Sequence, residues 1–543
     1  MNSAWVIVGG YAIAMVAFAI WARRDLGRED ESYYLAGRSL SGPILLITMA
    51  ATNFSAFTVY GSSGASYRIG ISFLPIMAFG TGFMAVSMYL LGRKVRARSV
   101  EHGAMTAPEM ILGQTGSRNA QLVMASVLVI ATIPYLALQP RAAGIVVSAL
   151  FGGPEWVGAV LVTVLVVGYT LTGGLKAVVR TDVVQGAIAL FLLWIGLAMV
   201  INDAGGLGVA MDAISSSEET SGLLGREGNY TLLIWSSMMV LWLFADPMFP
   251  QLYQRLCAAE SDYAIGRMAT LYPAVAWLAF LPPILIGTLG HLDNPGLDKA
   301  GSDNILPTMI MHVGGEWLGG LVLVAGLAAL MSTMDSQLLA TGSLVTRDLV
   351  PKGDSEGLSR ESVIISLAFL GLLLSLWSDL SILDLGLLAF SMYAVMFPSV
   401  FASSHFENID GRAVIASIAA GESVVLLAVF SPESFDGWWV EPVGGAAPTA
   451  VIPSLAAAII GLASVQYACN RRIGFEWLSQ IGSGEMAPMA GLLAVFVLAQ
   501  DFWWWEDSET WGLGLPKWIW WAALLSLVQT GIMVKWVVKD ETR

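Results

Sequence analysis

The sequence predicts an all-α polytopic membrane protein with about fifteen transmembrane helices. Hydrophobic residues make up 56% of the 543 residues and charged residues only 13%, whereas soluble domains carry roughly 25% charged residues. Windows of about 20 mostly apolar residues, each long enough to cross a bilayer as a helix, recur from Ala4–Trp21 to Trp518–Val538. The polar stretches between them are too short to bury a core of their own. We therefore expect one integral membrane domain over residues 1–543.

The first apolar window is expected to form an additional amino-terminal helix, followed by a cytoplasmic loop that ends near residue 40. Arg23 and Arg24 follow this window directly, where a cleavable signal peptide would carry small residues. Short loops rich in Lys and Arg stay on the cytoplasmic side. This rule predicts a protein of the cell membrane with its amino terminus outside and its carboxyl terminus in the cytoplasm. Five basic residues fall outside in this topology: Arg68, Arg141, Arg226, Lys299 and Lys517.

Two breaks in the apolar pattern divide residues 41–405 into two sets of five helices. Small polar residues interrupt the first helix of one set at Ala51–Ser55, and the stretch Ala245–Pro250 interrupts the first helix of the other. An odd number of helices per set gives the two sets opposite orientations, which is the pattern of a 5+5 inverted repeat. Paired breaks at corresponding positions indicate a binding site at mid-membrane. Residues 406–543 are expected to add further helices outside the repeat.

The stretches Ala51–Thr58 and Ala329–Ser336 both place small polar residues inside apolar sequence. Hydrocarbon cannot hydrogen-bond to them, so they must face each other, water or a bound solute. The chain has neither a P-loop that would couple ATP hydrolysis to movement nor a paired acid, base and nucleophile that would indicate an enzyme. The sequence therefore predicts a transporter that is driven by an ion gradient, and not an enzyme.

These residues resemble the sodium:solute symporter family, which shares the leucine-transporter-type core. Five motifs carry the resemblance in matching order along the chain: Tyr34–Leu40, Ala50–Ala56, Thr172–Asp182, Tyr253–Arg255, and Gly326–Gln337 continuing to Thr346–Asp348. Two weaker ones, Tyr67–Gly70 and Leu136–Gly144, resemble the monocarboxylate-type branch. The resemblance implies a sodium-coupled symporter that imports a small organic solute by alternating access, with a monocarboxylate as the first candidate.

The resemblance also implies a main sodium site. Its ligands would be the backbone carbonyls of Ala51, Phe54 and Ala329 and the hydroxyls of Ser332 and Thr333. Helical spacing independently puts residues 329, 332 and 333 on one face, and sodium, a hard cation, prefers oxygen ligands of this kind. The alternative is that both hydroxyls bond to carbonyls of their own helix, as membrane Ser and Thr often do.

A second sodium site is suggested by Asp182, Asp335 and Ser336, together with Ser332, at positions that some family members use for another sodium. Two alternatives stay open for these carboxylates. Asp182 would pair with Arg180 or Lys176 at the cytoplasmic interface, and Asp335 would cap or pair locally.

Arg141 is a fixed cation within a spanning segment, which costs at least about 2.5 kcal/mol unless it is paired or hydrated. One hypothesis is that its guanidinium fork binds a substrate carboxylate. The alternatives are a pair with Asp246, or a side chain that reaches the outer interface. We expect Arg141, Ser55, Thr58, Asp246 and Phe249 to form the substrate pocket, although Thr58 and Phe249 also fit ordinary packing.

Several alternatives for the function remain at this point. Proline, other amino acids, pantothenate and sugars are further candidate solutes, and a proton would replace sodium if Asp182 or Asp335 carried it. A membrane sensor that keeps the core without moving solute is a third class. The expected partners are the solute, Na⁺ and membrane lipid, with no nucleic acid and no obligate protein partner.

Overall fold

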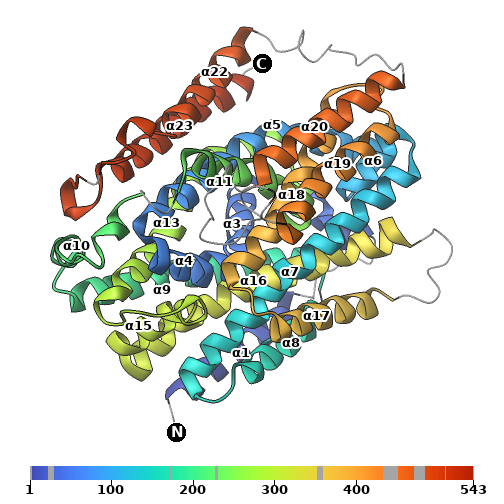
Figure 1. Cartoon of the computed structure of the whole chain (residues 1–543). Coiled ribbons are helices and arrows are strands. Elements are labelled where there is room, and N and C mark those ends of the chain that lie inside the picture. Colours follow the sequence, from blue (N-terminus) through green and yellow to red (C-terminus); the bar gives the residue numbers. More distant parts are fainter. Residues whose placement is uncertain are drawn as a thin grey trace.

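In the computed structural model the chain forms a bundle of helices (Figure 1). The structure describes residues 3–22, 30–171, 173–226, 230–350, 359–431, 434, 450–469, 483–507 and 509–541. Arg23, Arg24 and Thr172 lie outside these ranges. Within them every regular element is a helix, apart from two isolated β-bridges. The all-α class predicted from the composition is therefore confirmed.

The predicted number of membrane spans is not confirmed within the described part of the chain. Eleven helices of the described part are long and apolar enough to cross a membrane, or up to thirteen if each of two bent pairs counts as one span. Three shorter apolar helices are not in that count: Trp5–Phe18 within α1 (Ser3–Ala22), α8 (Glu155–Thr170) and α10 (Leu207–Ser216). A total of about fifteen is not confirmed.

The central part of the chain contains two successive series of helices. The first series comprises α3 (Gly42–Asn53) with η3 (Phe57–Gly61) and α4 (Ser62–Ile69), then α5 (Gly80–His102), α7 (Arg118–Phe151), α8 and α9 (Leu175–Asp203). The second comprises α11 (Leu232–Ala245) with η7 (Asp246–Met248) and α12 (Pro250–Ala258), then α13 (Asp262–Leu289), α16 (Gly320–Ser343), α17 (Arg360–Trp377) and α18 (Ile382–His405). Each series opens on a bent pair, as the 5+5 pattern requires.

Both bends fall where the sequence predicts a break. The chain turns by 62° between α3 and η3 and by 56° between η7 and α12. At the first break Phe54 leaves the helical conformation, with a ψ of 87°. At the second break Phe249 has a ψ of 123° because it precedes Pro250, which disfavours the α conformation of the residue before it. Local sequence chemistry therefore opens backbone polar groups at two places inside the bundle.

Further helices surround the two series. α19 (Gly411–Phe430) and α20 (Val451–Ala468) pack against each other and against α18, while α22 (Ser483–Leu498) and α23 (Lys517–Glu541) form a second pair whose α23 contacts α13. The two pairs lie on different flanks of the bundle in Figure 1. Shorter helices, α2 (Asp30–Leu35), α6 (Ala107–Thr115), α10 (Leu207–Ser216) and α15 (Ile305–Gly314), connect the longer helices along the chain.

The centre of the bundle is formed by α3 and α16, which contact each other and α9. Two glycines allow the close approach that the broken helix requires. A Cβ on Gly326 would come within 1.7 Å of the Tyr60 hydroxyl, and one on Gly186 within 2.8 Å of the Ala51 side chain. Larger residues at either position would push α16 or α9 away from the break.

The five basic residues that the topology rule assigns to the outside all have acceptors. Arg68 lies 3.8 Å from Asp303, Lys299 2.7 Å from Asp384, and the other contacts are Arg226 with Asp501, Lys517 with Asp507 and Glu509, and Arg141 with the Ser378 carbonyl. Burial raises the pKa of Asp303 above its ordinary value. Local partners thus compensate these charges.

Candidate functional site

Oxygen atoms from α3 and α16 converge at the first break. The Ser332 hydroxyl lies 3.1 Å from the Ala51 carbonyl oxygen, and the Thr333 hydroxyl lies 3.0 Å from that of Thr52 and 3.3 Å from that of Ala329. Both hydroxyls therefore bond to carbonyls of α3, and Thr333 also bonds to the Ala329 carbonyl of its own helix. The alternative, in which both hydroxyls bond only within α16, does not account for these contacts. Phe54, the remaining predicted carbonyl ligand, is the residue at which α3 ends.

This donor set fits sodium. It consists of neutral carbonyl and hydroxyl oxygens from a discontinuous helix and its neighbour, buried from water. Such oxygens replace the hydration shell of a monovalent cation without holding it too tightly for release. The helix break supplies the oxygens on the α3 side, because carbonyls that end a helix have no partner within it, whereas Ala329, Ser332 and Thr333 lie within α16.

Asp182 lies directly beside these oxygens and is fully buried on α9. Its Oδ1 lies 2.6 Å from the Ser332 hydroxyl, and its Oδ2 accepts hydrogen bonds from Thr48 and Thr52 of α3. The guanidinium of Arg255 on α12 lies 2.7 Å from the same Oδ2. Asp182 therefore pairs with Arg255, and not with Arg180 or Lys176.

Arg255 joins the two halves of the predicted second sodium site. It donates to Asp182, to the Ser336 hydroxyl at 2.8 Å and to the Thr48 hydroxyl at 2.8 Å. Asp335, whose carboxyl accepts from Ser336 at 3.3 Å, interacts electrostatically with both Asp182 and Arg255. Two carboxyl groups therefore lie near one guanidinium, which contacts only Asp182 of the two, and this buried cluster carries one excess negative charge when both are ionised.

The second break carries a different kind of carboxylate. Asp246 in η7 is 1% exposed, and its Oδ2 accepts one hydrogen bond, at 3.1 Å, from the Asn53 amide of α3. The same amide donates to the Tyr272 hydroxyl at 2.9 Å. Oδ1 of Asp246 accepts no hydrogen bond from the described residues. The two breaks are thus linked to each other through Asn53.

Ser55 and Gln139 complete the polar groups at this level. The Gln139 carbonyl oxygen accepts the Ala56 N–H at 3.1 Å, and the Ser55 hydroxyl accepts the Phe57 N–H at 3.2 Å and pairs with Tyr135. Side chains thereby satisfy the backbone N–H groups that follow the break. Neither Ser55 nor Gln139 brings a charge toward Asp246.

Six aromatic side chains form one packed group beside Asp246, which we call the aromatic cluster: Phe57, Tyr135, Trp242, Phe249, Phe390 and Tyr393. Phe390 of α18 is its centre, with ring centroids 4.8 Å from Tyr135, 5.0 Å from Phe249 and 5.1 Å from Phe57. The cluster thus joins both broken helices to α7 and α18. Such offset and edge-to-face contacts stabilise the group beyond its burial alone.

Two of the predicted pocket residues, Arg141 and Thr58, are not among the contacts described above. Arg141 is half-buried and donates to the Ser378 carbonyl at 2.8 Å, in the loop between α17 and α18. It therefore does not pair with Asp246. Thr58 is buried in η3, next to Phe57 of the aromatic cluster.

Sequence reasoning missed the partners of both aspartates. Arg255, Asn53 and Gln139 were recognised only as parts of motifs, and Tyr272 was not singled out at all. A signal was present for Arg255, because an arginine within Pro250–Ala258 needs a buried counterion if that segment is inside the membrane. The amides gave no signal, since their role depends on which helices meet.

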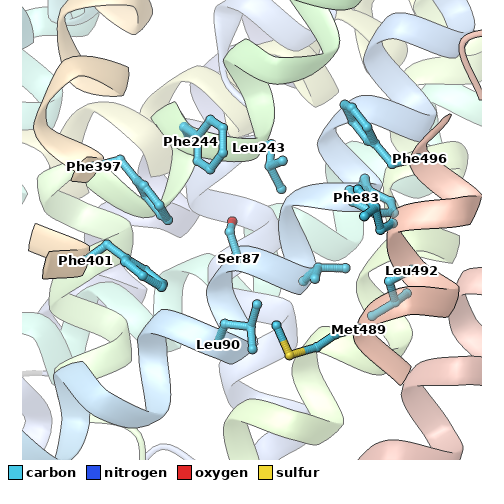
Figure 2. A pocket seen from close by; sticks show the side chains of 12 residues that line it. Phe83, Ser87, Leu90, Leu243, Phe244, Phe397, Phe401, Met489, Leu492 and Phe496 are labelled. Atoms are coloured by element: carbon cyan, nitrogen blue, oxygen red, sulfur yellow. The ribbon is translucent and has the colours of Figure 1, made fainter. Parts of the chain in front are cut away.

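An apolar cavity of about 360 Å³ lies between α5, α11, α18 and α22 (Figure 2). Phe244, Phe397 and Phe401 line one side of it and Phe83, Leu492 and Phe496 the other, with the Ser87 hydroxyl between them. That hydroxyl donates to the Met84 carbonyl of its own helix. The cavity offers hydrocarbon surface and no ion ligands, so it is separate from the candidate site.

Comparisons with known proteins agree with this geometry. The model of the sodium:solute symporter family matches residues 33–402. The sodium/pantothenate symporter of Escherichia coli is 25% identical over 426 residues, which cover 76% of this chain and 87% of that protein. The sodium/proline symporter of the same organism is 28% identical over 354 residues, covering 62% and 68%.

One solved structure shows the same fold. A substrate-bound, outward-open Na⁺-coupled sialic acid symporter superposes with a TM-score of 0.70 and 18% identity, covering 86% of this chain and 98% of that one. It shares the leucine-transporter-type arrangement of two broken helices. The inverted-repeat core predicted from the paired breaks is confirmed.

Proposed function

The chain belongs to the sodium:solute symporter family, and from this membership we propose that it imports a small organic solute through a site between its two broken helices. It is a multi-pass membrane protein that uses Na⁺ as its coupling ion, and it is not an enzyme. The observation that carries the proposal is the junction of α3 and α16, where helix-end carbonyls and two hydroxyls meet. We further propose the cell membrane as its location, with the amino terminus outside.

In the proposed main site, sodium binds the carbonyls of Ala51, Phe54 and Ala329 and the hydroxyls of Ser332 and Thr333. Sodium would then join α3, from the first repeat, to α16, from the second. Because these oxygens belong to different repeats, the ion favours the conformation in which they converge. Solute and ion then each increase the affinity for the other, and movement of the repeats around the site transfers both.

A second cation is proposed at Asp182, Asp335 and Ser336. The excess negative charge of that cluster supports it, whereas Arg255 already contacts Asp182 and Ser336. A second ion matters most for an anionic solute. A tenfold sodium gradient supplies about 1.4 kcal/mol, and a potential of about 100 mV adds about 2.3 kcal/mol per net charge moved. One sodium ion that moves with a monoanion transfers no net charge, so it gains nothing from the potential.

The candidate solutes follow from the relatives and from the pocket. Pantothenate and proline are transported by the two relatives named above, as their names state, and a monocarboxylate was favoured by Arg141. Arg141 now supports that class less, since its guanidinium is bound to Ser378. Ser55, Thr58, Asp246 and Phe249 remain the proposed pocket residues.

The proposal is tested by uptake into proteoliposomes that contain the purified full-length chain. Labelled acids, amino acids and sugars are offered with an inward sodium gradient, with equal sodium on both sides, and with a proton gradient alone at fixed sodium. Accumulation that requires the sodium gradient supports the proposal. Accumulation driven by the proton gradient alone, or saturable binding without accumulation, would favour the proton-coupled or the sensor alternative instead.

A further inference from the structure

The chemical class of the solute can be narrowed from the surroundings of Asp246, an inference that rests on the proposed function. Asp246 is buried at the second break, and one of its carboxylate oxygens has no hydrogen-bond partner among the described residues. A carboxylate inside a membrane protein is costly unless a cation or several donors compensate it. A group that binds at this position can supply the missing partner.

The chain itself does not supply it. Within the part that the structure describes, no basic side chain pairs with Asp246. Arg255 is bound to Asp182, and Arg141 is bound to the Ser378 carbonyl. The polar neighbours of Asp246 are neutral, namely the Asn53 amide and the Tyr135 and Tyr272 hydroxyls. Among the described residues, the site therefore holds one carboxyl group and no basic side chain.

The aromatic cluster lies next to the Asp246 carboxyl. Trp242 on α11 precedes Asp246 by four residues, and Phe249 follows Asp246 by three residues at the same break. Tyr135 interacts with the Asp246 carboxyl, and its ring contacts that of Phe249. The electron-rich faces of such rings attract positively charged nitrogen, most strongly where the contact is shielded from water. Aromatic rings grouped in this way are a known kind of site for quaternary ammonium groups.

We propose that the transported solute carries a positively charged nitrogen, which binds Asp246 and lies against the rings of the aromatic cluster. The carboxylate gives this solute its ionic partner, and the rings replace the water that the nitrogen loses. A zwitterion such as an amino acid and a cation such as a quaternary amine both satisfy this requirement. A plain monocarboxylate does not, because it would bring a second negative charge to Asp246.

The first experiment uses pairs of molecules that have nearly the same shape but differ in charge. Binding to the purified full-length protein in saturating sodium is measured by tryptophan fluorescence for three pairs: choline and 3,3-dimethylbutan-1-ol, glycine betaine and 3,3-dimethylbutanoate, and L-proline and cyclopentanecarboxylate. We expect the nitrogen-bearing member of at least one pair to bind roughly ten- to hundredfold more tightly than its carbon analogue. Carbon analogues that bind as tightly as the amines would overturn the proposal.

The second experiment uses Asp246→Asn, which removes the charge and keeps the size of the side chain. We expect the preference for the charged member of the pair to fall to about twofold or less, with the sodium concentration for half-maximal binding unchanged. The matched control is Glu422→Gln, since Glu422 is another buried carboxylate whose oxygens have no partner among the described residues, but it lies on α19 outside the repeats. The control variant should keep the preference.

Failure of this inference is distinct from failure of the proposed function. Binding selectivity between charged and uncharged analogues is independent of whether transport requires a sodium gradient. If Asp246→Asn changes the sodium dependence and leaves the choice between analogues intact, Asp246 is an ion ligand, and the solute class proposed here is wrong. If the amines bind selectively but do not accumulate under a sodium gradient, the inference stands and the symport proposal fails.

Discussion

Asp182 and Asp246 are both buried aspartates beside a helix break, yet their surroundings differ. Asp182 is contacted by hydroxyls from α3 and α16 and by the Arg255 guanidinium. Asp246 receives one amide hydrogen bond and otherwise faces aromatic rings. The first carboxylate is satisfied by the chain itself, and the second is not.

Asp182 already has a cationic partner within the protein, whereas Asp246 is available to a ligand. A fully paired carboxylate holds helices together, and its loss leaves a buried arginine without a counterion. An unsatisfied carboxylate lowers stability in the empty protein and recovers that cost when a partner binds. We therefore propose that Asp182, paired with Arg255 beside the proposed second cation, helps to join the repeats, and that Asp246 binds the solute.

The largest expected effect is on stability at the first region. Asp182→Asn should lower the free energy of unfolding by about 3–5 kcal/mol, because Arg255 remains buried without its counterion. The apparent unfolding temperature in detergent, followed by tryptophan fluorescence, measures it. Asp246→Asn should leave that temperature unchanged or raise it.

The matching control combines Asp182→Asn with Arg255→Gln, which removes both charges. It should recover part of the lost stability, since no lone charge remains buried. Equal destabilisation by Asp182→Asn and Asp246→Asn would remove the distinction between the two regions.

The next effect concerns sodium. Thr333→Ala removes a hydroxyl that lies 3.0 Å from the Thr52 carbonyl across the junction. Loss of one oxygen ligand to a cation, about 1.5–3 kcal/mol, should raise the sodium concentration for half-maximal uptake roughly ten- to hundredfold.

Thr288→Ala is the control for that variant, because among the described residues the Thr288 hydroxyl bonds only to the Ile284 carbonyl of its own helix. It should change the sodium dependence by less than about twofold. If both alanine variants respond alike, Thr333 has no special relation to sodium.

A smaller loss of stability is expected at a satisfied pair outside the site. Arg226 contacts Asp501 and is surrounded by the rings of Trp235, Trp505 and Trp518. Asp501→Asn should cost about 1–2 kcal/mol, less than Asp182→Asn, because the rings still stabilise the guanidinium. The unfolding temperature should fall while the sodium dependence of uptake stays the same; a shift in sodium affinity would show that this outer pair is coupled to the site.

The smallest effect is expected from Arg141→Gln. Its guanidinium donates to the Ser378 carbonyl, and glutamine retains a donor amide. The apparent affinity for solute should change by less than about twofold in the uptake assay. A large loss of affinity for anionic solutes alone would restore Arg141 as a carboxylate ligand and weaken the assignment of Asp246.

The sequence predicted the helices and their breaks better than the side-chain contacts between them. The breaks at Ala51–Ser55 and Ala245–Pro250 could be located because small polar residues and prolines interrupt helices by local chemistry. The hydroxyls of Ser332 and Thr333 could be placed on one face by periodicity. The number of spans was less certain, because short apolar helices such as α8 fall near the length limit.

Side-chain partners could not be predicted in the same way. Asp182 and Arg255 are 73 positions apart, and Asn53 and Asp246 are 193 apart, so their pairing depends on how four helices pack. Arg141 illustrates the reverse case. Its charge correctly indicated that it needs a partner, but the partner is a loop carbonyl that sequence alone gave no reason to choose.

The central claim is that sodium binds where the end of α3 meets α16, and direct binding of radioactive sodium to the purified protein tests it. The wild-type chain should bind the ion saturably, and the double variant Ser332→Ala, Thr333→Ala should lose that binding, while Thr288→Ala keeps it. Saturable binding of the same affinity in the double variant would contradict the claim.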